Sequence, residues 1–595
     1  MRIINDTNLI KLPDDSTCRF FVQIWYSMVH RNSLDSHRVR SMNSLNILRE
    51  LGDLISKEDL PNILDDIKRA AEEALDIMQK DKIISLHFEG LLERIKPLLE
   101  EIIKASKSKG IKDSPSFFML RYLTRDFTTD LIQRYKHCII EELEKSIFKT
   151  KSEDNIFAYT GTLLSVLIDE GHSIEELFGF AKNIFVERRG DTAYAFEKSF
   201  NFMKRLIDHP DYEYDIIFRL EGFKKKELVP SIIGDVEFLE IFTIESDERV
   251  SAFLSPGLNV LLGKTRVKAQ DDRSAGAIAK KKLDDILDLI RFEMEHEIIT
   301  VSQEFVSLRL SNSSSRVFKL PSQIPNPNKN ITAEEFEQFV KSISEVLDSK
   351  TIHRESKERI KSAIRFYRMG RDSEQFENKY LNWWTALEYL LRSNEGKIIE
   401  QIEDKLKTIL VLNYTAKHLC SFRNTFLSCG LRPSPKICQQ FSIESYELLP
   451  LYDIFAAIHN ADEMAHINGR LSSYPAVKFH LDRFVSQTRN PNDLLNTLSN
   501  HEDHVRWQIH RIWRLRCDIV HSAEYSVNLV LLSANIEYYL KYLLSEMLGK
   551  LCNNRAIESL AELFDRMSYS YDRLKSDLKN GKMDFHSEIL RTGLI

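Results

Sequence analysis

Glycine and proline are scarce in this chain of 595 residues: there are 19 glycines and 15 prolines, about half the usual share of each. Because both residues interrupt helices, their scarcity favours a largely helical protein. The chain also lacks a run of the ~18 apolar residues that a membrane-spanning helix needs, and its first residues lack the apolar segment of a secretory signal. We therefore expect a soluble, cytoplasmic protein with no membrane partner.

An excess of basic charge and closely paired cysteines are also missing. The net charge of −6 and the pI near 6.3 exclude a globally basic nucleic-acid binder, so any contact with RNA must come from a local patch. The seven cysteines are odd in number and not closely paired, which indicates a reducing compartment rather than a disulfide scaffold.

Hydrophobic periodicity divides the chain into three regions. Residues 1–210 are expected to be helical, and because no constellation there suggests chemistry, a sensor or regulatory role is inferred by elimination. Residues 211–330 are expected to form an α+β module, which ends in a Pro/Asn-rich stretch at 321–330, and residues 331–595 a helical domain with an insertion at about 412–500. The expected fold class is mainly α with a small α+β module. Within the module, strands are expected at 212–220, 236–244, 259–262 and 305–310, with a helix from 274 to 290.

One motif inside the module resembles a phosphate-binding loop but is better explained as a strand. In GLNVLLGKT (residues 257–265), five residues separate the two glycines where the phosphate cradle takes four. No helix is expected to begin at Lys264 and Thr265, so no helix N-terminus would meet a phosphate there. The motif therefore predicts a strand that ends in a turn.

The most informative stretch is RWQIHRIWRLRCDIVH (residues 506–521), which places four arginines, two tryptophans and two histidines on one expected helix. Arg516 and His521 are the two side-chain types that a metal-free ribonuclease needs. Histidine exchanges a proton near neutral pH, and guanidinium stabilises charge that builds on a phosphoryl group. Asp518 lies three residues before His521 and shares its helical face, so it is placed to fix the imidazole tautomer. Arg514 lies four residues before Asp518, at the spacing of an ordinary helical ion pair.

The spacing of Arg516 and His521 constrains how they can meet one phosphate. Five positions of a regular helix amount to about 500° of rotation, so the two side chains point about 140° apart. Either the helix starts or is distorted inside the motif, or two copies of the chain face each other across a two-fold axis. We favour the dimer, because an isologous contact brings the same stretch of both chains together.

These residues carry a resemblance to a known family. WRLRCDIVH resembles the Arg-x(4–6)-His signature of HEPN ribonucleases and is similar to the Apea-like subgroup. A second stretch, RFYRMGRDSEQFENKYLNWWTALEYLL (residues 365–391), resembles the early helices of that subgroup. The resemblance covers about residues 350–595. The chain departs from the pattern at Cys517, where the family usually has Asn, and the loss of that amide keeps a non-catalytic reading open.

The resemblance implies a C-terminal HEPN-type helical bundle and a metal-independent endoribonuclease without a cofactor. Catalysis would rest on Arg516 and His521, with Asp518, Arg514 and Glu388 in supporting roles. The expected substrate is single-stranded or loop RNA such as a tRNA loop, and the expected assembly is a homodimer through the HEPN domain. Families of this kind are often toxins or abortive-infection proteins in anti-phage defence, which suggests a phage-derived or cellular trigger.

A basic stretch marks the candidate RNA groove. Residues 353–371 carry seven basic and two acidic side chains, a local charge of +5. Such a stretch is often only a solvated face, but phosphate contacts from it would give affinity that depends on salt and not on sequence. Of the adjacent pair Trp383 and Trp384, one is expected in the core. The candidate RNA-binding residues are Arg365, Arg368, Arg371 and Arg511.

Two alternatives remain. One is a HEPN-type scaffold that binds RNA, nucleotide or protein without catalysis. The other is an ordinary helix in which Arg516 and His521 pair with acidic neighbours.

Overall fold

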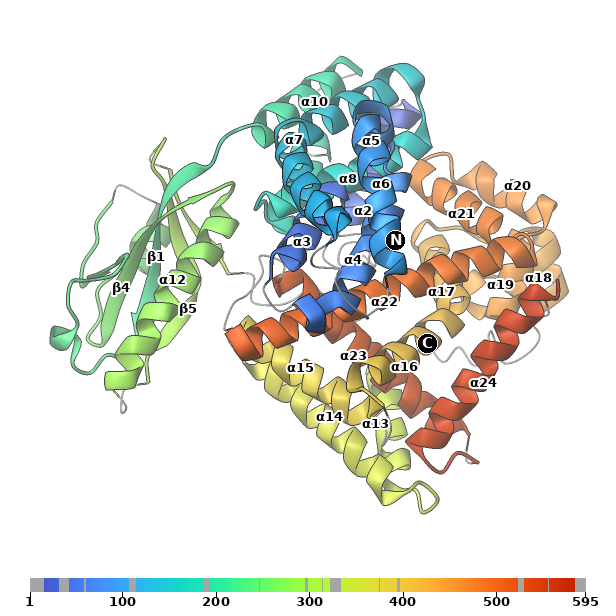
Figure 1. Ribbon diagram of the computed structural model, residues 1–595. Helices are drawn as coiled ribbons and strands as arrows, with labels where there is room; N and C mark the ends of the chain where they lie inside the picture. The colour runs from blue at the N-terminus through green and yellow to red at the C-terminus, as the bar shows by residue number, and fades with distance from the viewer. Residues whose placement is uncertain are drawn as a thin grey trace. The chain divides into compact units, whose positions relative to one another are not determined.

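The computed structural model forms two compact units (Figure 1). Unit 1 comprises residues 1–165 and 325–595, and unit 2 comprises residues 166–324. In the part of the chain that the structure describes, no helix is both long enough and apolar enough to cross a bilayer. The structure describes residues 15–30, 42–57, 60–105, 114–186, 193–244, 247–294, 298–312, 314–320, 333–373, 375–392, 396–522, 529–554 and 556–583.

The N-terminal part of unit 1 is built from helices whose starts are capped by short polar side chains. Asn43, for example, accepts hydrogen bonds from the amides of Leu45 and Asn46, and Asp81 caps the helix that follows it. The helices α3 and α4 pack against each other, and α4 also packs against α6. Their bounds are α2 Ser16–Val29, α3 Ser44–Ser56, α4 Leu60–Lys80, α5 Lys82–His87, α6 Glu89–Lys104, α7 Pro115–Lys145, the π-helical η2 Ser146–Thr150 and α8 Glu153–Asp169.

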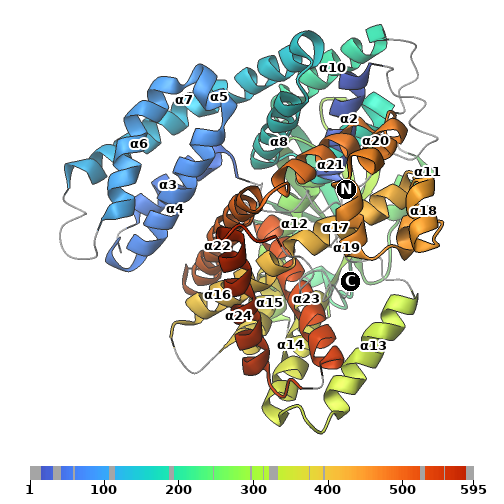
Figure 2. The same cartoon turned by 90° about the vertical axis from the view of Figure 1, so that its right-hand side faces the viewer.

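The C-terminal part of unit 1 is also helical, and three of its helices, α16, α22 and α24, pack against one another (Figure 2). The bounds are α13 Ala333–Asp348, α14 Arg354–Asp372, α15 Phe376–Leu391, α16 Ile398–Leu412, α17 Tyr414–Ser428, α18 Pro435–Phe441, η5 Tyr446–Leu448, α19 Leu451–Ile458, α20 Ala461–Arg470, α21 Pro475–Gln487, α22 Pro491–Ser522, α23 Leu529–Asn553 and α24 Leu560–Lys579. The residues that the sequence assigned to two separate helical regions thus contribute to one compact unit.

Helices α14 and α15 form an antiparallel pair. Arg359, near the start of α14, donates to the backbone oxygens of Tyr389 and Leu390 at the end of α15, with N–O distances of 2.8 and 3.0 Å. At the other end, Lys379 donates to the backbone oxygen of Arg371. Arg359 therefore satisfies the free carbonyls of a helix C-terminus.

The expectation that only one of Trp383 and Trp384 is in the core is wrong, because both are buried. Helix α15 is covered on two sides. Trp383 lies toward α14, where its Nε1 donates to the backbone oxygen of Tyr367, and Trp384 lies 5.4 Å from the ring of Trp513 on α22. Neighbouring positions on a helix can both be buried when the helix lies between two partners.

Unit 2 contains one six-stranded antiparallel sheet with the strand order β2-β3-β4-β1-β5-β6. The central strand β1 pairs with β4 and β5, and Tyr212 lies opposite Ala269 in the first of these pairings. The bounds are α9 Ile174–Gly179, η3 Phe180–Val186, α10 Ala193–Ile207, β1 Tyr212–Glu221, η4 Lys226–Leu228, β2 Ile232–Ile233, β3 Val236–Leu239, α11 Glu248–Phe253, β4 Val260–Ala269, α12 Asp272–Glu293, β5 Thr300–Arg309 and β6 Ser314–Lys319.

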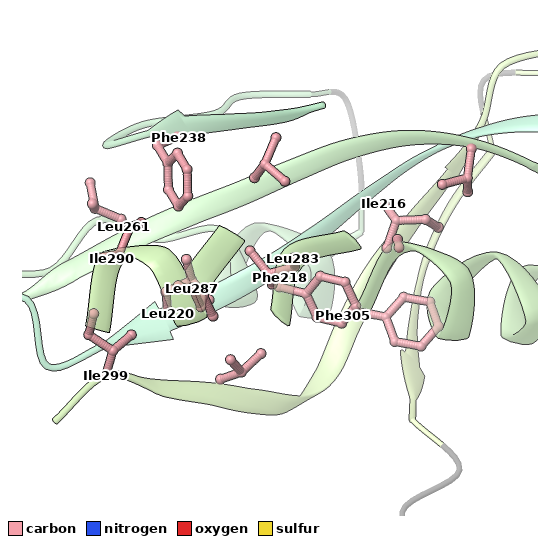
Figure 3. Close-up of a cluster of buried hydrophobic side chains, with 14 of the residues drawn as sticks. Ile216, Phe218, Leu220, Phe238, Leu261, Leu283, Leu287, Ile290, Ile299 and Phe305 are labelled. Atoms are coloured by element: carbon pink, nitrogen blue, oxygen red, sulfur yellow. The ribbon is translucent and has the colours of Figure 1, made fainter. Parts of the chain in front are cut away.

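The core of unit 2 lies between α12 and one face of the sheet (Figure 3). Leu283 and Leu287 of α12 meet Phe218 and Leu220 of β1 and Phe305 of β5. Phe218 and Leu220 face α12 together because every second side chain of a strand points to the same face of the sheet. The expected helix after residue 274 and the strands in β1, β4 and β5 are confirmed. Strand β4 lies where the phosphate-binding loop was rejected, but it continues through Lys264 and Thr265 to Ala269 instead of ending in a turn there.

Three expected strands of unit 2 differ in extent. The strand expected at 236–244 ends at Leu239, the one expected at 259–262 continues to Ala269, and the one expected at 305–310 already begins at Thr300. The stretch at 321–330 lies outside the residues that the structure describes. The strands β2 and β6 were not expected, since Ile232–Ile233 is too short for a period to be recognised and Ser314–Lys319 is largely polar.

A buried carboxyl makes the stability of unit 2 depend on pH. Burial, followed by the charges of Asp271 and Asp272, raises the pKa of Glu176 from its ordinary 4.5 to about 7. Between these values the folded state binds more protons than the unfolded state, so stability falls as the pH rises from about 4.5 to about 7, by up to about 3 kcal/mol. We expect protection of α12 amides from hydrogen exchange, corrected for intrinsic rates, to fall across this range. Glu176→Gln should remove that dependence, and an unchanged pH profile would contradict it.

Candidate active site

Helix α22 carries the Arg516 and His521 pair and continues without a break from Pro491 through Ser522. Its apolar side chains at helical spacing, Val505, Ile509, Ile512 and Leu515, are buried. This face anchors the helix and turns its arginines toward other elements. Tyr380 of α15 fixes the helix further, since its hydroxyl donates to the backbone oxygen of Ile512 at 2.7 Å.

Arg511 is bound by two carboxylates from the N-terminal helices. Its Nε donates to Glu50 of α3 at 2.7 Å, and its Nη2 donates to Glu73 of α4 at 2.5 Å. Only 9% of Arg511 and 6% of Glu73 is exposed. In this structure the guanidinium of Arg511 is therefore buried and already paired, so it offers no free contact to RNA.

Arg514 is engaged by the same region. It donates to Glu50 and lies 3.7 Å from Asp66 of α4. Burial alone would raise the pKa of Glu50, but the charges of Arg511 and Arg514 hold it below the ordinary value. Burial raises the pKa of Glu73, which meets only Arg511 directly. The supporting role expected for Arg514 at the catalytic pair is not reflected in these contacts.

Arg506 and His510 pair with a fourth carboxylate, Glu403 of α16. Their distances to its oxygens are 2.7 and 2.6 Å. Although burial alone would raise the pKa of Glu403, the hydrogen bonds from His510 and Arg506 lower it to about 2. Four basic residues of α22 therefore pair with acids: Arg506, His510, Arg511 and Arg514.

Arg516 differs from the other arginines of the motif. Its guanidinium carbon lies 5.2 Å from the ring centroid of Trp513, and its side chain is partly exposed. Within the described residues, no carboxylate lies within ion-pair distance of it. Such a cation–π contact orients the guanidinium without neutralising its charge.

A chain of contacts connects Glu388 to Arg516. Trp384 donates from Nε1 to Glu388 at 2.5 Å, Trp384 packs on Trp513, and Trp513 carries Arg516. Glu388 is thus separated from Arg516 by two aromatic rings and does not touch it.

Three further residues of the motif are Asp518, His521 and Cys517. Asp518 pairs with Lys57, the residue after α3, at 3.0 Å. His521 lies in the last turn of α22, but its side chain is outside the described part of the structure. Burial raises the pKa of Cys517, so its thiol stays protonated near neutral pH.

The second half of α14 presents an exposed basic surface. Arg365, Arg368 and Arg371 are exposed, while Phe366 stacks on Tyr389 with ring centroids 5.3 Å apart. The start of α15 lies beside α22, where the Tyr380 hydroxyl donates to the backbone oxygen of Ile512 (Figure 1). Tyr367 of the same helix donates from its hydroxyl to Glu537 at 2.8 Å.

The acidic partners of α22 were missed from the sequence. Glu50, Asp66 and Glu73 lie more than 400 residues before the arginines that they pair with, and Glu403 lies 103 residues before Arg506. The one local signal is Glu73, a carboxylate among the buried alanines Ala70, Ala71 and Ala74 of α4. A charge on a buried apolar face indicates a buried partner, but it does not identify that partner.

The described residues include no group of three or more histidine, cysteine or acidic side chains arranged to hold a metal ion. No protein family, no curated protein and no solved structure matches this chain.

Proposed function

We propose that the chain is a metal-independent endoribonuclease that cleaves single-stranded or loop RNA, with a tRNA loop as one candidate substrate. The observation that supports this best is the state of Arg516. It is the arginine of the motif with no carboxylate partner among the described residues, and it lies five positions before His521 on an unbroken helix.

The proposed reaction is an internal transesterification. The ribose 2′-oxygen attacks the adjacent phosphorus, and the bond from phosphorus to the 5′-oxygen breaks. His521 takes the proton from the 2′-hydroxyl or protonates the leaving 5′-oxygen, and Arg516 stabilises the charge on the phosphorane. The products carry a 2′,3′-cyclic phosphate and a 5′-hydroxyl, and the need for a 2′-hydroxyl confines the reaction to RNA.

The continuity of α22 supports a homodimer. Because the helix neither starts nor breaks inside the motif, positions 516 and 521 lie about 140° apart around its axis on one chain. An isologous contact through the C-terminal helices would let Arg516 of one protomer and His521 of the other act on the same phosphate.

Substrate binding is assigned to the exposed basic surface of α14. Arg365, Arg368 and Arg371 would contact phosphates, and the stacked pair of Phe366 and Tyr389 offers an aromatic surface to unpaired bases. By its resemblance to HEPN proteins, the chain would act in the cytoplasm as a toxin or abortive-infection effector in anti-phage defence, released by a phage-derived or cellular trigger.

A HEPN-type scaffold that binds RNA, nucleotide or protein is the second candidate. Two observations favour it. Cys517 replaces the Asn of the family signature with a protonated thiol, and Asp518 is engaged by Lys57.

Incubation of the purified protein with total RNA, with and without EDTA, tests the proposal. We expect cleavage that survives the chelator and yields 5′-hydroxyl ends. Cleavage that stops with the chelator would indicate a metal-dependent nuclease, and intact RNA under all conditions would favour the scaffold.

A further inference from the structure

We propose that helices α3 and α4 form an autoinhibitory clamp that holds arginines of α22 in place of RNA phosphates; this rests on the proposed function. We call Glu50, Asp66 and Glu73 the acidic clamp. Its three carboxylates come from two adjacent helices and converge on Arg511 and Arg514.

The contacts have the chemistry of phosphate recognition. A guanidinium presents its N–H groups as a planar fork that fits carboxylate and phosphate oxygens alike. Arg511 uses this fork on Glu50 and Glu73, through Nε at 2.7 Å and Nη2 at 2.5 Å. The clamp thereby neutralises the arginines five and two residues before Arg516, whose own charge has no such partner among the described residues.

The region of the N-terminal helices also contacts the motif itself. Lys57, at the end of α3, donates to Asp518 at 3.0 Å, two residues after Arg516. This outer contact is exposed, with 45% of the Lys57 side chain and 39% of the Asp518 side chain accessible. The same two helices therefore cover α22 from a buried inner contact to an exposed outer one.

Stability alone is a weak reason for such an arrangement. Taking charged groups out of water costs about as much as their mutual attraction returns, and apolar side chains of similar size often serve a core equally well. Arginines that are buried against carboxylates, on the helix that carries a phosphate-handling motif, fit a device in which RNA and the acidic clamp compete.

Binding of a fluorescein-labelled oligouridylate, measured by anisotropy over a range of salt concentrations, tests this competition. The background variant His521→Ala prevents cleavage. We expect Glu50→Gln combined with Glu73→Gln to tighten binding by about tenfold and to steepen the dependence of log Kd on log salt by roughly 0.7 for each arginine released.

The matched control is Glu502→Gln. Glu502 is also a partly buried, ion-paired carboxylate and lies on α22, but it pairs with Lys575 and Lys407 and not with an arginine. We expect this variant to bind RNA as the background protein does. Equal binding by the Glu50→Gln, Glu73→Gln variant would overturn the proposal, as would an equal gain in the control.

A measurement without clamp substitutions covers the case in which that variant does not fold. In the full-length His521→Ala protein, saturating oligouridylate should lower the hydrogen-exchange protection of α3 and α4. Unchanged or increased protection of both helices would overturn the clamp.

Cleavage by the clamp variant with His521 intact separates the two proposals. Tighter binding without cleavage supports the clamp and contradicts the nuclease. Cleavage at the wild-type rate, with unchanged binding, supports the nuclease and contradicts the clamp.

Discussion

Replacement of His521 by alanine is expected to lower the rate of RNA cleavage by about 10²–10⁴-fold, because the group that moves the proton is lost. Arg516→Ala should lower it by about 10²–10³-fold, because the charge that stabilises the phosphorane is lost. Both effects should appear in kcat with little change in the affinity for uncleaved RNA. Single-turnover cleavage of a labelled RNA and parallel binding measurements separate these quantities.

Two control variants sharpen this prediction. His504→Ala removes another histidine of α22, which lies 3.8 Å from Asp76, and should cleave at the wild-type rate. Arg516→Lys retains the charge but loses the planar fork, so we expect partial activity. Full activity of either alanine variant, Arg516→Ala or His521→Ala, would contradict the assignment of that residue.

Arg511→Ala is expected to lower the free energy of unfolding of unit 1 by about 3–5 kcal/mol, since it leaves Glu50 and Glu73 with less compensating charge in a buried site. Urea unfolding can be followed by tryptophan fluorescence, because all five tryptophans lie in unit 1. Arg573→Ala serves as the comparison. Its guanidinium pairs with Asp577 at 3.7 Å and 53% of its side chain is exposed, so its loss should cost about 0.5 kcal/mol or less.

A second substitution tests the cause of that loss. Arg511→Met together with Glu73→Leu removes the charge of both partners and fills the site with apolar groups, while Glu50 keeps Arg514. We expect most of the lost stability to return. A loss below about 1 kcal/mol for Arg511→Ala would contradict a buried ion pair at this place.

The fold class, the strands β1, β4 and β5 and the helix α12 were predictable because they depend on local patterns. Scarce glycine and proline indicated helices, and alternating apolar residues located β1 and β5. The spacing of Gly257 and Gly263 sufficed to replace a phosphate-binding loop with strand β4. Each of these inferences needs only a few neighbouring residues and the period of a helix or a strand.

The environment of the candidate site was not predictable in the same way. Whether Arg511 and Arg514 are free or paired depends on helices that lie more than 400 residues away in the sequence. The sequence therefore assigned Arg511 to RNA binding and Arg516 to catalysis, although the first is buried between carboxylates and the second rests on Trp513. The burial of both Trp383 and Trp384 likewise depends on which helices cover α15.

The central claim is that Arg516 of one protomer and His521 of another act on a single phosphate. A heterodimer of Arg516→Ala and His521→Ala chains, co-expressed with different tags and purified through both, tests it directly. Across a two-fold axis, one of the two sites then keeps both groups, so about half of the wild-type cleavage should return although each homodimer is inactive. A heterodimer as inactive as its parents would contradict the claim.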